Sequence, residues 1–275
     1  MKNIPLEDSF SDVIGKAQRG LKLSDEALAA RAELTPAIVT DLKEGQWNEK
    51  AVGQIARALQ LAPAPLLALA RKEYLPQPQT LEGLLQINAP YEDMTVNSYL
   101  VYDPKSREAI AFDTGPEASV LLNAATQAQV KIALILLTHT HIDHVVALPD
   151  LKKATGAPAW VSAEEEFPGA AAFAVGKEFS LGGLRVATRR TSGHARGGVT
   201  FVVSGLRRPL AIVGDAIFAG SMGGGAISYE DALRTNRDSI FTLPDDCILG
   251  PGHGPLTTVG EEKKNNPFYP EFQRV

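Results

Sequence analysis

The sequence predicts an α+β domain preceded by a small all-α domain, and three observations support this division. Apolar residues recur at helical spacing in the first quarter of the chain, whereas short β-rich and alternating runs dominate afterwards. Between the two patterns, Pro76 and Pro78 stand among glutamines, which is typical of a linker. We therefore expect an all-α domain over 1–73, a linker over 74–81 and an α+β domain over 82–275.

The composition excludes several classes of protein. The 275 residues are 44% hydrophobic and 21% charged, so the chain can bury a core and is not disordered. A net charge of −5 disfavours a dominant nucleic-acid or anionic-membrane surface. No apolar run reaches the roughly 18 residues that a membrane span needs, and the first residues do not resemble a secretory signal. We therefore expect a cytoplasmic protein without membrane contact.

Short capped helices are expected in the first domain. Ser24 and Thr35 are favourable N-caps, and Pro36 occupies a first helical position, where its missing N–H costs nothing. Gly45 is expected to end the helix that Pro36 begins. The predicted helices cover 25–32, 36–43 and about 52–59. This pattern resembles the lambda-repressor-like helix-turn-helix family across roughly residues 10–70.

The residues that would face DNA in such a domain are unfavourable for DNA binding. The second helix of a helix-turn-helix contacts bases through its first residues, and from Thr35 to Asp41 it offers no Arg, Lys, Asn or Gln. Residues 1–75 hold ten basic and ten acidic side chains. We expect little or no DNA affinity, and a role in homodimerisation or in covering the second domain. A DNA-tethered regulator with a metal-binding sensor domain is the alternative from a different functional class.

The second domain is predicted to alternate strands with two helices. The helices are expected over 117–128 and 143–155. Strands are expected over 84–88, 95–102, 109–113, 132–138, 159–162, 184–188, 199–203 and 210–213.

All five histidines are expected in loops that follow strand-like runs of this domain. Three of them and an aspartate fall within residues 139–144, directly after the buried run 132–137. An extended pair at i and i+2 can point two imidazoles the same way, while the turn into the next helix aims Asp143 and His144 at a second point. The remaining candidate ligands follow other strands and are flanked by glycines that allow tight turns: His194, Asp215 and His253.

This constellation resembles the metallo-β-lactamase superfamily, whose motif is HxHxDH followed by a distant His, a bridging Asp and a last His. The motif is filled in order by His139, His141, Asp143, His144, His194, Asp215 and His253. The resemblance implies an αββα four-layer sandwich behind the small helix-turn-helix domain. It also implies one metal ion on His139, His141 and His194, a second on Asp143, His144 and His253, and Asp215 as a ligand of both.

Imidazole and carboxylate ligands suit divalent transition-metal ions, so we expect two zinc ions, with iron or manganese compatible. Two cations sharing Asp215 can bind a bridging water, lower its pKa to roughly 7 and make a hydroxide nucleophile. Asp143 and Asp215 are thus the expected catalytic carboxylates. Asp113 resembles the family's position that hydrogen-bonds to a ligand without binding metal. The lack of a ligand cysteine argues against a true β-lactamase, and Cys247 is expected to be an unreactive strand residue.

Within the superfamily the sequence most resembles short forms of glyoxalase II, a thioesterase that hydrolyses lactoylglutathione. The resemblance spans about 82–270 and rests on 138–144, 214–218, 251–258 and 266–268. Three departures put that substrate in doubt. The chain ends soon after His253, where long forms continue into a glutathione-binding helical domain; residues 219–225 lack a basic residue usual in the family; and Val145 stands where glycine is common. We therefore predict a hydrolase of a small acyl thioester or ester, of hydroxyacylglutathione hydrolase type.

Substrate recognition is expected to involve Arg196, because it lies in the loop that follows His194 and could bind an anionic group. A solvent-facing loop arginine is the alternative interpretation. Other activities stay open for the same ligands: an iron-dependent persulfide dioxygenase, which the complete second ligand set disfavours, a lactonase or a phosphodiesterase.

Overall fold

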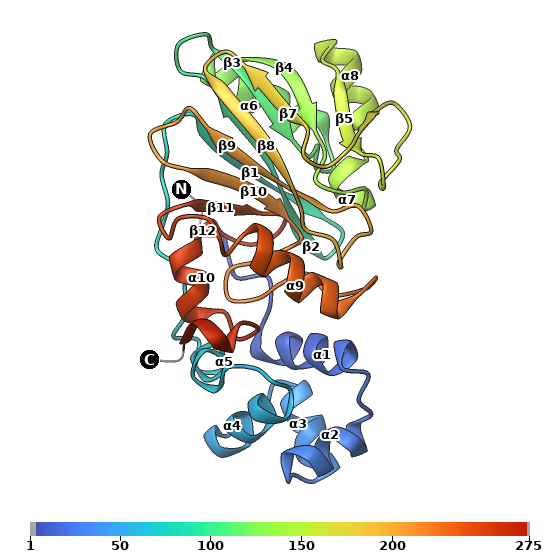
Figure 1. Cartoon of the computed structure of the whole chain (residues 1–275), viewed down its shortest axis with the longest axis vertical. Helices are drawn as coiled ribbons and strands as arrows, with labels where there is room; N and C mark the ends of the chain where they lie inside the picture. Colours follow the sequence, from blue (N-terminus) through green and yellow to red (C-terminus); the bar gives the residue numbers. More distant parts are fainter. Residues whose placement is uncertain (1–3, 274–275) are drawn as a thin grey trace.

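The computed structural model describes residues 4–273, and its first part is a unit of short helices (Figure 1). These are α1 (Phe10–Gly20), α2 (Asp25–Ala32), α3 (Pro36–Lys43), α4 (Glu49–Ala58) and α5 (Pro63–Ala70). The helices α2 and α3 cover the predicted residues. Ser24 and Thr35 cap them as expected, since their side-chain oxygens accept the N–H groups of Ala27 and Ile38. The assignment of this unit to a helix-turn-helix family stays a prediction.

Two six-stranded sheets follow. In spatial order, the first contains β1 (Leu84–Tyr91), β2 (Met94–Tyr102), β3 (Glu108–Phe112), β4 (Lys131–Leu136), β5 (Ala159–Ser162) and β6 (Ala171–Phe173). The second contains β12 (Thr257–Thr258), β11 (Ile248–Pro251), β10 (Leu210–Gly214), β9 (Val199–Ser204), β8 (Leu184–Arg190) and β7 (Glu178–Leu181). Strands β3 to β6 run parallel to one another, as do β10 and β11, and all other neighbours are antiparallel.

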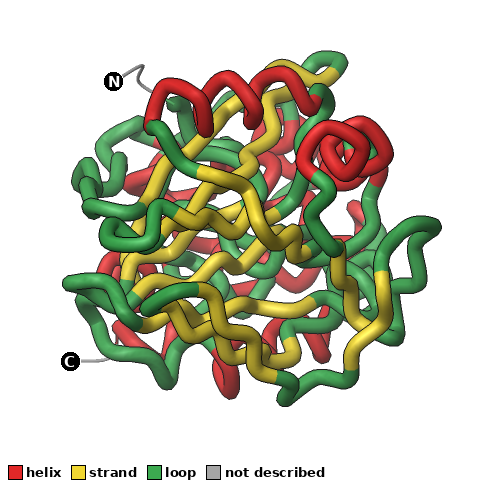
Figure 2. The backbone as a smooth tube through the Cα atoms, turned by 90° about the horizontal axis from the view of Figure 1, so that it is seen from above, coloured by secondary structure: helices red, strands yellow, loops and turns green. Residues whose placement is uncertain are grey.

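The sheets pack face to face with helices outside them, which confirms the predicted αββα sandwich. Side chains from both sheets form the central core, where the rings of Phe112 and Phe201 lie 5.4 Å apart. A second core joins the first sheet to α6 (Ala118–Ala128) and α8 (Leu148–Thr155). The strands run through the middle of the molecule in Figure 2, with helices along its margin. The outer face of the second sheet is covered by α9 (Tyr229–Ser239) and α10 (Val259–Asn265).

The helical unit shares its core with the outer face of the second sheet. One continuous cluster of buried side chains includes Ile14 of α1, Leu66 of α5, Leu249 of β11 and Phe268. Figure 1 shows α1 beneath α9 and α5 below α10. In the predicted linker, Tyr74 is buried, and its hydroxyl donates a hydrogen bond to the Glu262 carboxylate at 3.1 Å. The helical unit therefore forms part of the outer helical layer.

The structure corrects two expectations. The helix predicted over 143–155 is two helices, α7 (Ile142–Val145) and α8, because Pro149 has no N–H to continue a preceding helix and instead occupies the first turn of α8. Cys247 is buried but precedes β11 by one residue, so it is not a strand residue. Within residues 4–273, no helix combines the length and apolar character needed to cross a membrane.

Candidate metal centre

Strand ends bring the candidate ligands to one edge of the sandwich. Because β3 and β4 are parallel neighbours, Asp113 and His139, which follow them, emerge side by side. Strands β10 and β11 are also parallel neighbours, so Asp215 and His253, which follow them, emerge side by side as well. His194 joins them from the connection between β8 and β9. The topology therefore assembles residues from both sheets at one place.

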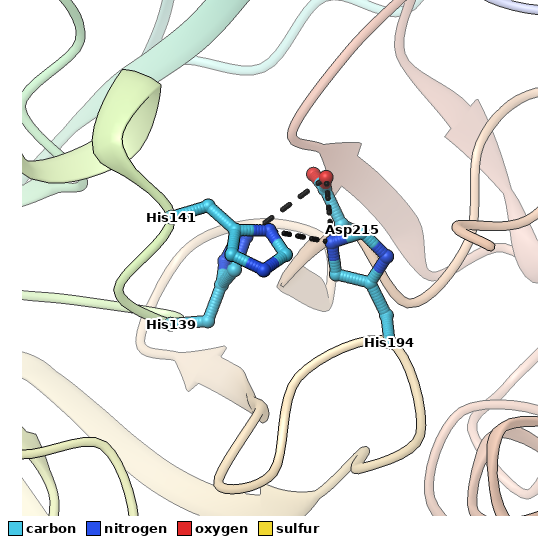
Figure 3. A group of neighbouring side chains, drawn as sticks. All are labelled: His139, His141, His194 and Asp215. Carbon is cyan, nitrogen blue, oxygen red and sulfur yellow. Dashed lines mark hydrogen bonds and ion pairs between the residues drawn. The ribbon is translucent and has the colours of Figure 1, made fainter. Parts of the chain in front are cut away.

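The first group of ligand atoms belongs to His139, His141, His194 and Asp215, and these atoms all lie within 4.8 Å of one another. Nε2 of His194 lies 2.8 Å from Nδ1 of His141 and 3.2 Å from the Asp215 carboxylate. Nε2 of His139 is 3.9 Å from the same carboxylate. Figure 3 shows the three imidazoles and the carboxylate pointing toward one another. Three rings and an acid that converge in this way could hold a metal ion.

The second group contains Asp143, His144 and His253. A single Asp143 oxygen lies 3.3 Å from Nε2 of each of the two histidines. Asp215 also reaches this group, because its two oxygens lie 3.4 Å from His144 Nε2 and 3.5 Å from His253 Nε2. Asp215 thus lies between the two groups.

Buried polar atoms without partners indicate that these groups fit metal ions. Within residues 4–273, His139 Nε2, His144 Nε2 and Asp215 Oδ1 are buried and have no hydrogen-bond partner. An unpaired buried polar atom costs about 1–3 kcal/mol, so three at one point need an explanation. Coordination would satisfy all three. The imidazole and carboxylate set suits a divalent transition metal without identifying which one.

The protein holds the opposite side of four of the five rings. The Asp113 carboxylate accepts hydrogen bonds from the Thr138 N–H at 2.7 Å and from His144 Nδ1 at 3.0 Å. Nδ1 of His139 lies 3.0 Å from the Thr138 hydroxyl. His253 Nδ1 donates to the carbonyl of Thr95 at 2.7 Å, and His194 Nδ1 donates to that of Gly224 at 3.0 Å. These contacts turn the free nitrogens inward, as in known metal centres.

The Asp215 carboxylate is closely enclosed by backbone. A β-carbon on Gly252 would lie 2.0 Å from Asp215 Oδ1 and 2.7 Å from the His144 ring. Only glycine therefore allows the β11 end to approach both ligands.

Comparison with known proteins agrees with this geometry. A family model described as the metallo-beta-lactamase superfamily matches residues 91–253, which is more than half of the chain. The chain belongs to the metallo-beta-lactamase superfamily. This superfamily member is a hydrolase whose clustered histidines and aspartates could hold metal ions.

Individual relatives cover the same region of this superfamily member. The chain is 30% identical over 197 residues to hydroxyacylglutathione hydrolase GloC of Haemophilus influenzae, spanning 62% of this chain and 92% of the relative. The BLEG-1 B3 metallo-beta-lactamase structure superposes with a TM-score of 0.60 at 25% identity, covering 68% of this chain and 99% of that one. A di-iron-bound form of TTHA1623 matches at a TM-score of 0.53 and 25% identity, covering 66% and 98%.

Opposing effects set the charges of the ligands in the metal-free superfamily member. Burial disfavours charge on Asp215, but the neighbouring His144 and His253 outweigh it and hold the pKa of Asp215 well below its usual range. Burial lowers the pKa of His139 and that of His194. The same burial acts on His253, but the charge of Asp215 and hydrogen bonds to Asp143 and Asp215 raise its pKa to about 10. A cation would take the place of that proton.

A pocket of about 470 Å³ opens onto these ligands. Its lining includes the apolar or aromatic side chains of Tyr91, Met94, Ile142 and Phe218. It also includes Glu7 and Lys16, which belong to the N-terminal part of the chain. Sequence reasoning missed all six of these residues. No motif marks Glu7 or Lys16, because the helical pattern around them predicts a separate domain.

The sequence-predicted substrate cation lies elsewhere. Arg196 is exposed and is not among the residues that line the pocket. Its charge, after that of the hydrogen-bonded Arg190, helps to lower the pKa of Glu164. A role for Arg196 in substrate binding stays a prediction.

Proposed function

We propose that the protein is a metal-dependent thioesterase of the hydroxyacylglutathione hydrolase type. The observation that carries this proposal is the pair of complete ligand groups that meet at Asp215 beneath an open pocket. A relative of that name, 30% identical over 197 residues, supports the same reaction class.

Each ligand group has a distinct part in the proposal. His139, His141 and His194 would hold one ion, Asp143, His144 and His253 would hold another, and Asp215 would contact both. Divalent ions in these places would polarise the substrate carbonyl and lower the pKa of water beside it. Although burial opposes ionisation, contacts with His144 and His253 keep the pKa of Asp143 far below neutrality. Both aspartates therefore stay ionised and available to cations at neutral pH.

The pocket walls favour an acyl compound with an apolar part. Met94, the first residue of β2, is 41% exposed, and Ile142 of α7 is 55% exposed. Exposed apolar side chains next to metal ligands can cover the acyl group while the ligands face the scissile carbonyl. Phe218 packs edge-on against the His253 ring, with the ring centres 5.6 Å apart, and also lines the pocket. These side chains would give an acyl chain an apolar surface to pack against.

The proposal is tested by assaying lactoylglutathione hydrolysis near neutral pH with protein loaded with zinc, iron or manganese. We expect turnover with at least one metal and its loss in His139→Ala, because His139 contributes a buried ligand nitrogen. Cys247→Ala is the matched control, since burial raises the pKa of that thiol to about 12 and keeps it unreactive.

Metal-loaded protein that hydrolyses neither lactoylglutathione nor any other thioester would overturn the proposal. A His139→Ala variant with full activity would also contradict it. A β-lactam substrate run in parallel separates the proposed reaction from that named for the BLEG-1 structure.

A further inference from the structure

Polar contacts fix helix α1 onto the catalytic unit. Nζ of Lys16 forms an ion pair with Asp8 and donates a hydrogen bond to the carbonyl of Met222 at 2.9 Å. The Asp8 carboxylate also accepts the Ser221 hydroxyl at 2.5 Å. Lys16 and Asp8 are only 15% and 8% exposed, so these bonds are shielded from water. The start of the chain is therefore held against the segment that follows Phe218.

Apolar contacts make the same junction tight. The last residue of α1, Gly20, lies against the first residue of α9, Tyr229. A β-carbon on Gly20 would be 2.3 Å from the tyrosine ring. Ile14 and Ala17, on the same helix, are fully buried in the core shared with the second sheet. The helical unit is thus packed in a defined position beside the metal centre.

Because α1 packs in this position, it forms part of the pocket wall. Nζ of Lys16 lies 4.9 Å from the centre of the Phe218 ring, and that ring contacts His253. The Glu7 carboxylate approaches Nδ1 of His253 to 4.0 Å. The pocket above the ligands therefore has no complete wall without the first residues of the chain.

A larger groove adjoins the pocket and follows α1 away from the metal ligands. It measures about 860 Å³ and shares Lys16 and Gly224 with the pocket. The groove is lined by Arg19 of α1 and by Lys22, which follows that helix, together with residues 224–230, which include Ile227 and lead into α9. Ile227 is 58% exposed. A substrate that reached the metal ligands could extend along this groove.

The charges of the groove favour an anion. Arg19 and Lys22 are exposed, and within residues 4–273 no carboxylate lies within 4.0 Å of either. The Arg19 guanidinium extends back along the helix over Gly15, since NH1 would be 3.2 Å from a β-carbon there. It thus leans toward the pocket end of α1. Glu230 is the acidic residue of the groove, and Lys16 is neutralised by Asp8.

We infer that this groove binds an anionic extension of the substrate on Arg19 and Lys22 while the scissile carbonyl lies at the metal ligands. The inference rests on the proposed function and assigns the cationic part of the substrate site to the helical unit. A carboxylate and a phosphate share the required chemistry, because arginine can donate two parallel hydrogen bonds to either. The substrate class is accordingly a thioester with a negatively charged group remote from its carbonyl.

The test compares three thioesters on the full-length, metal-loaded protein. One carries glutathione with its carboxylates, one carries coenzyme A with its phosphates, and one carries uncharged N-acetylcysteamine. In Arg19→Gln/Lys22→Gln, the ratio of kcat/KM for a charged thioester to that for the uncharged one should fall about tenfold, mainly through KM. If the ratio falls only for the coenzyme A thioester, the groove binds phosphate. If it falls only for the glutathione thioester, the groove binds carboxylate.

Arg31→Gln/Lys50→Gln is the matched control, because it removes two exposed cations from the same helical unit away from the groove. An unchanged ratio for both charged thioesters in the Arg19/Lys22 double variant overturns the inference. If the wild type hydrolyses no thioester, the proposed function fails, and the groove is then judged by calorimetric titration with glutathione and coenzyme A. Binding that the double variant loses supports the groove; absent or equal binding overturns it.

Discussion

The carboxylate of Asp113 accepts a hydrogen bond from Nδ1 of His144, with the two atoms 3.0 Å apart. Since an ionised carboxylate can only accept, Nδ1 carries the proton and Nε2 faces Asp143 and Asp215. We expect Asp113→Asn to lower zinc affinity about 10- to 100-fold by releasing this orientation. Asparagine tolerates the positive φ of 54° at this position, so the backbone need not change.

Competition with a zinc chelator measures this affinity, and thermal unfolding of the metal-free variant serves as the control. An Asp113→Asn protein that binds zinc as tightly as the wild type would show that His144 is oriented by other contacts.

Metal binding should release protons and strengthen as pH rises. Despite burial, the charge of Asp215 and hydrogen bonds to Asp143 and Asp215 raise the pKa of His253 to about 10, so the ring is protonated at neutral pH in the metal-free protein. This raised pKa stabilises the metal-free fold below the unfolded value of 6.5, and that contribution is lost as pH rises through about 10. A metal ion must displace the same proton. We expect affinity to rise up to about tenfold per pH unit for each proton released.

Calorimetric titrations with zinc between about pH 6.5 and 8.5, in buffers of different ionisation enthalpy, count the protons directly. Affinity that falls over this range would contradict the assignment of His253 as a ligand.

Two glycine-to-alanine substitutions should have opposite effects on stability. Gly20→Ala places a methyl group against the Tyr229 ring and should lower the free energy of unfolding by about 1–3 kcal/mol. Gly53→Ala lies inside α4, where, apart from the adjoining residues and backbone of that helix, the described part of the chain brings only the tip of Arg57 within 4 Å of the new methyl, at 3.8 Å. Its higher helix propensity should raise the same free energy by up to about 1 kcal/mol. Urea unfolding measures the free energy of unfolding of both variants. If the two substitutions change it equally, α1 does not pack against α9 in solution.

The helical unit should bind DNA weakly or not at all. The helix that would enter the major groove, α3, begins with Pro36 and Ala37 and exposes Asp41. None of these side chains can donate a hydrogen bond to a base or neutralise a phosphate. Titration of a labelled duplex at low salt should therefore show no saturable binding, and sub-micromolar binding would disprove this expectation.

The sequence by itself determined the local features of the protein. Ser24 and Thr35 predict their helix starts, because an N-cap bonds to a backbone N–H only three residues away. The spacing of His139, His141, Asp143 and His144 likewise predicts a ligand cluster, because these residues share one strand end and one short helix. The strands β6, β7 and β12 and the helices α9 and α10 were not predicted, since they are short or polar and lack a clear period. The bounds of α1 and α5 were not predicted either, and β11 was expected only as a strand at Cys247, one residue before its start.

Only the tertiary structure decided that N-terminal residues line the pocket at the metal ligands. Lys16 and Met222 are 206 residues apart in the chain, yet they are joined by a hydrogen bond beside the pocket. Such a contact depends on how α1 packs against the second sheet, and packing of complementary shapes leaves no periodic signal in either segment. The helical pattern of the first residues is compatible with an independent domain. In the structure, however, the helical unit shares a buried core with the second sheet, and Glu7 and Lys16 line the pocket of the candidate site.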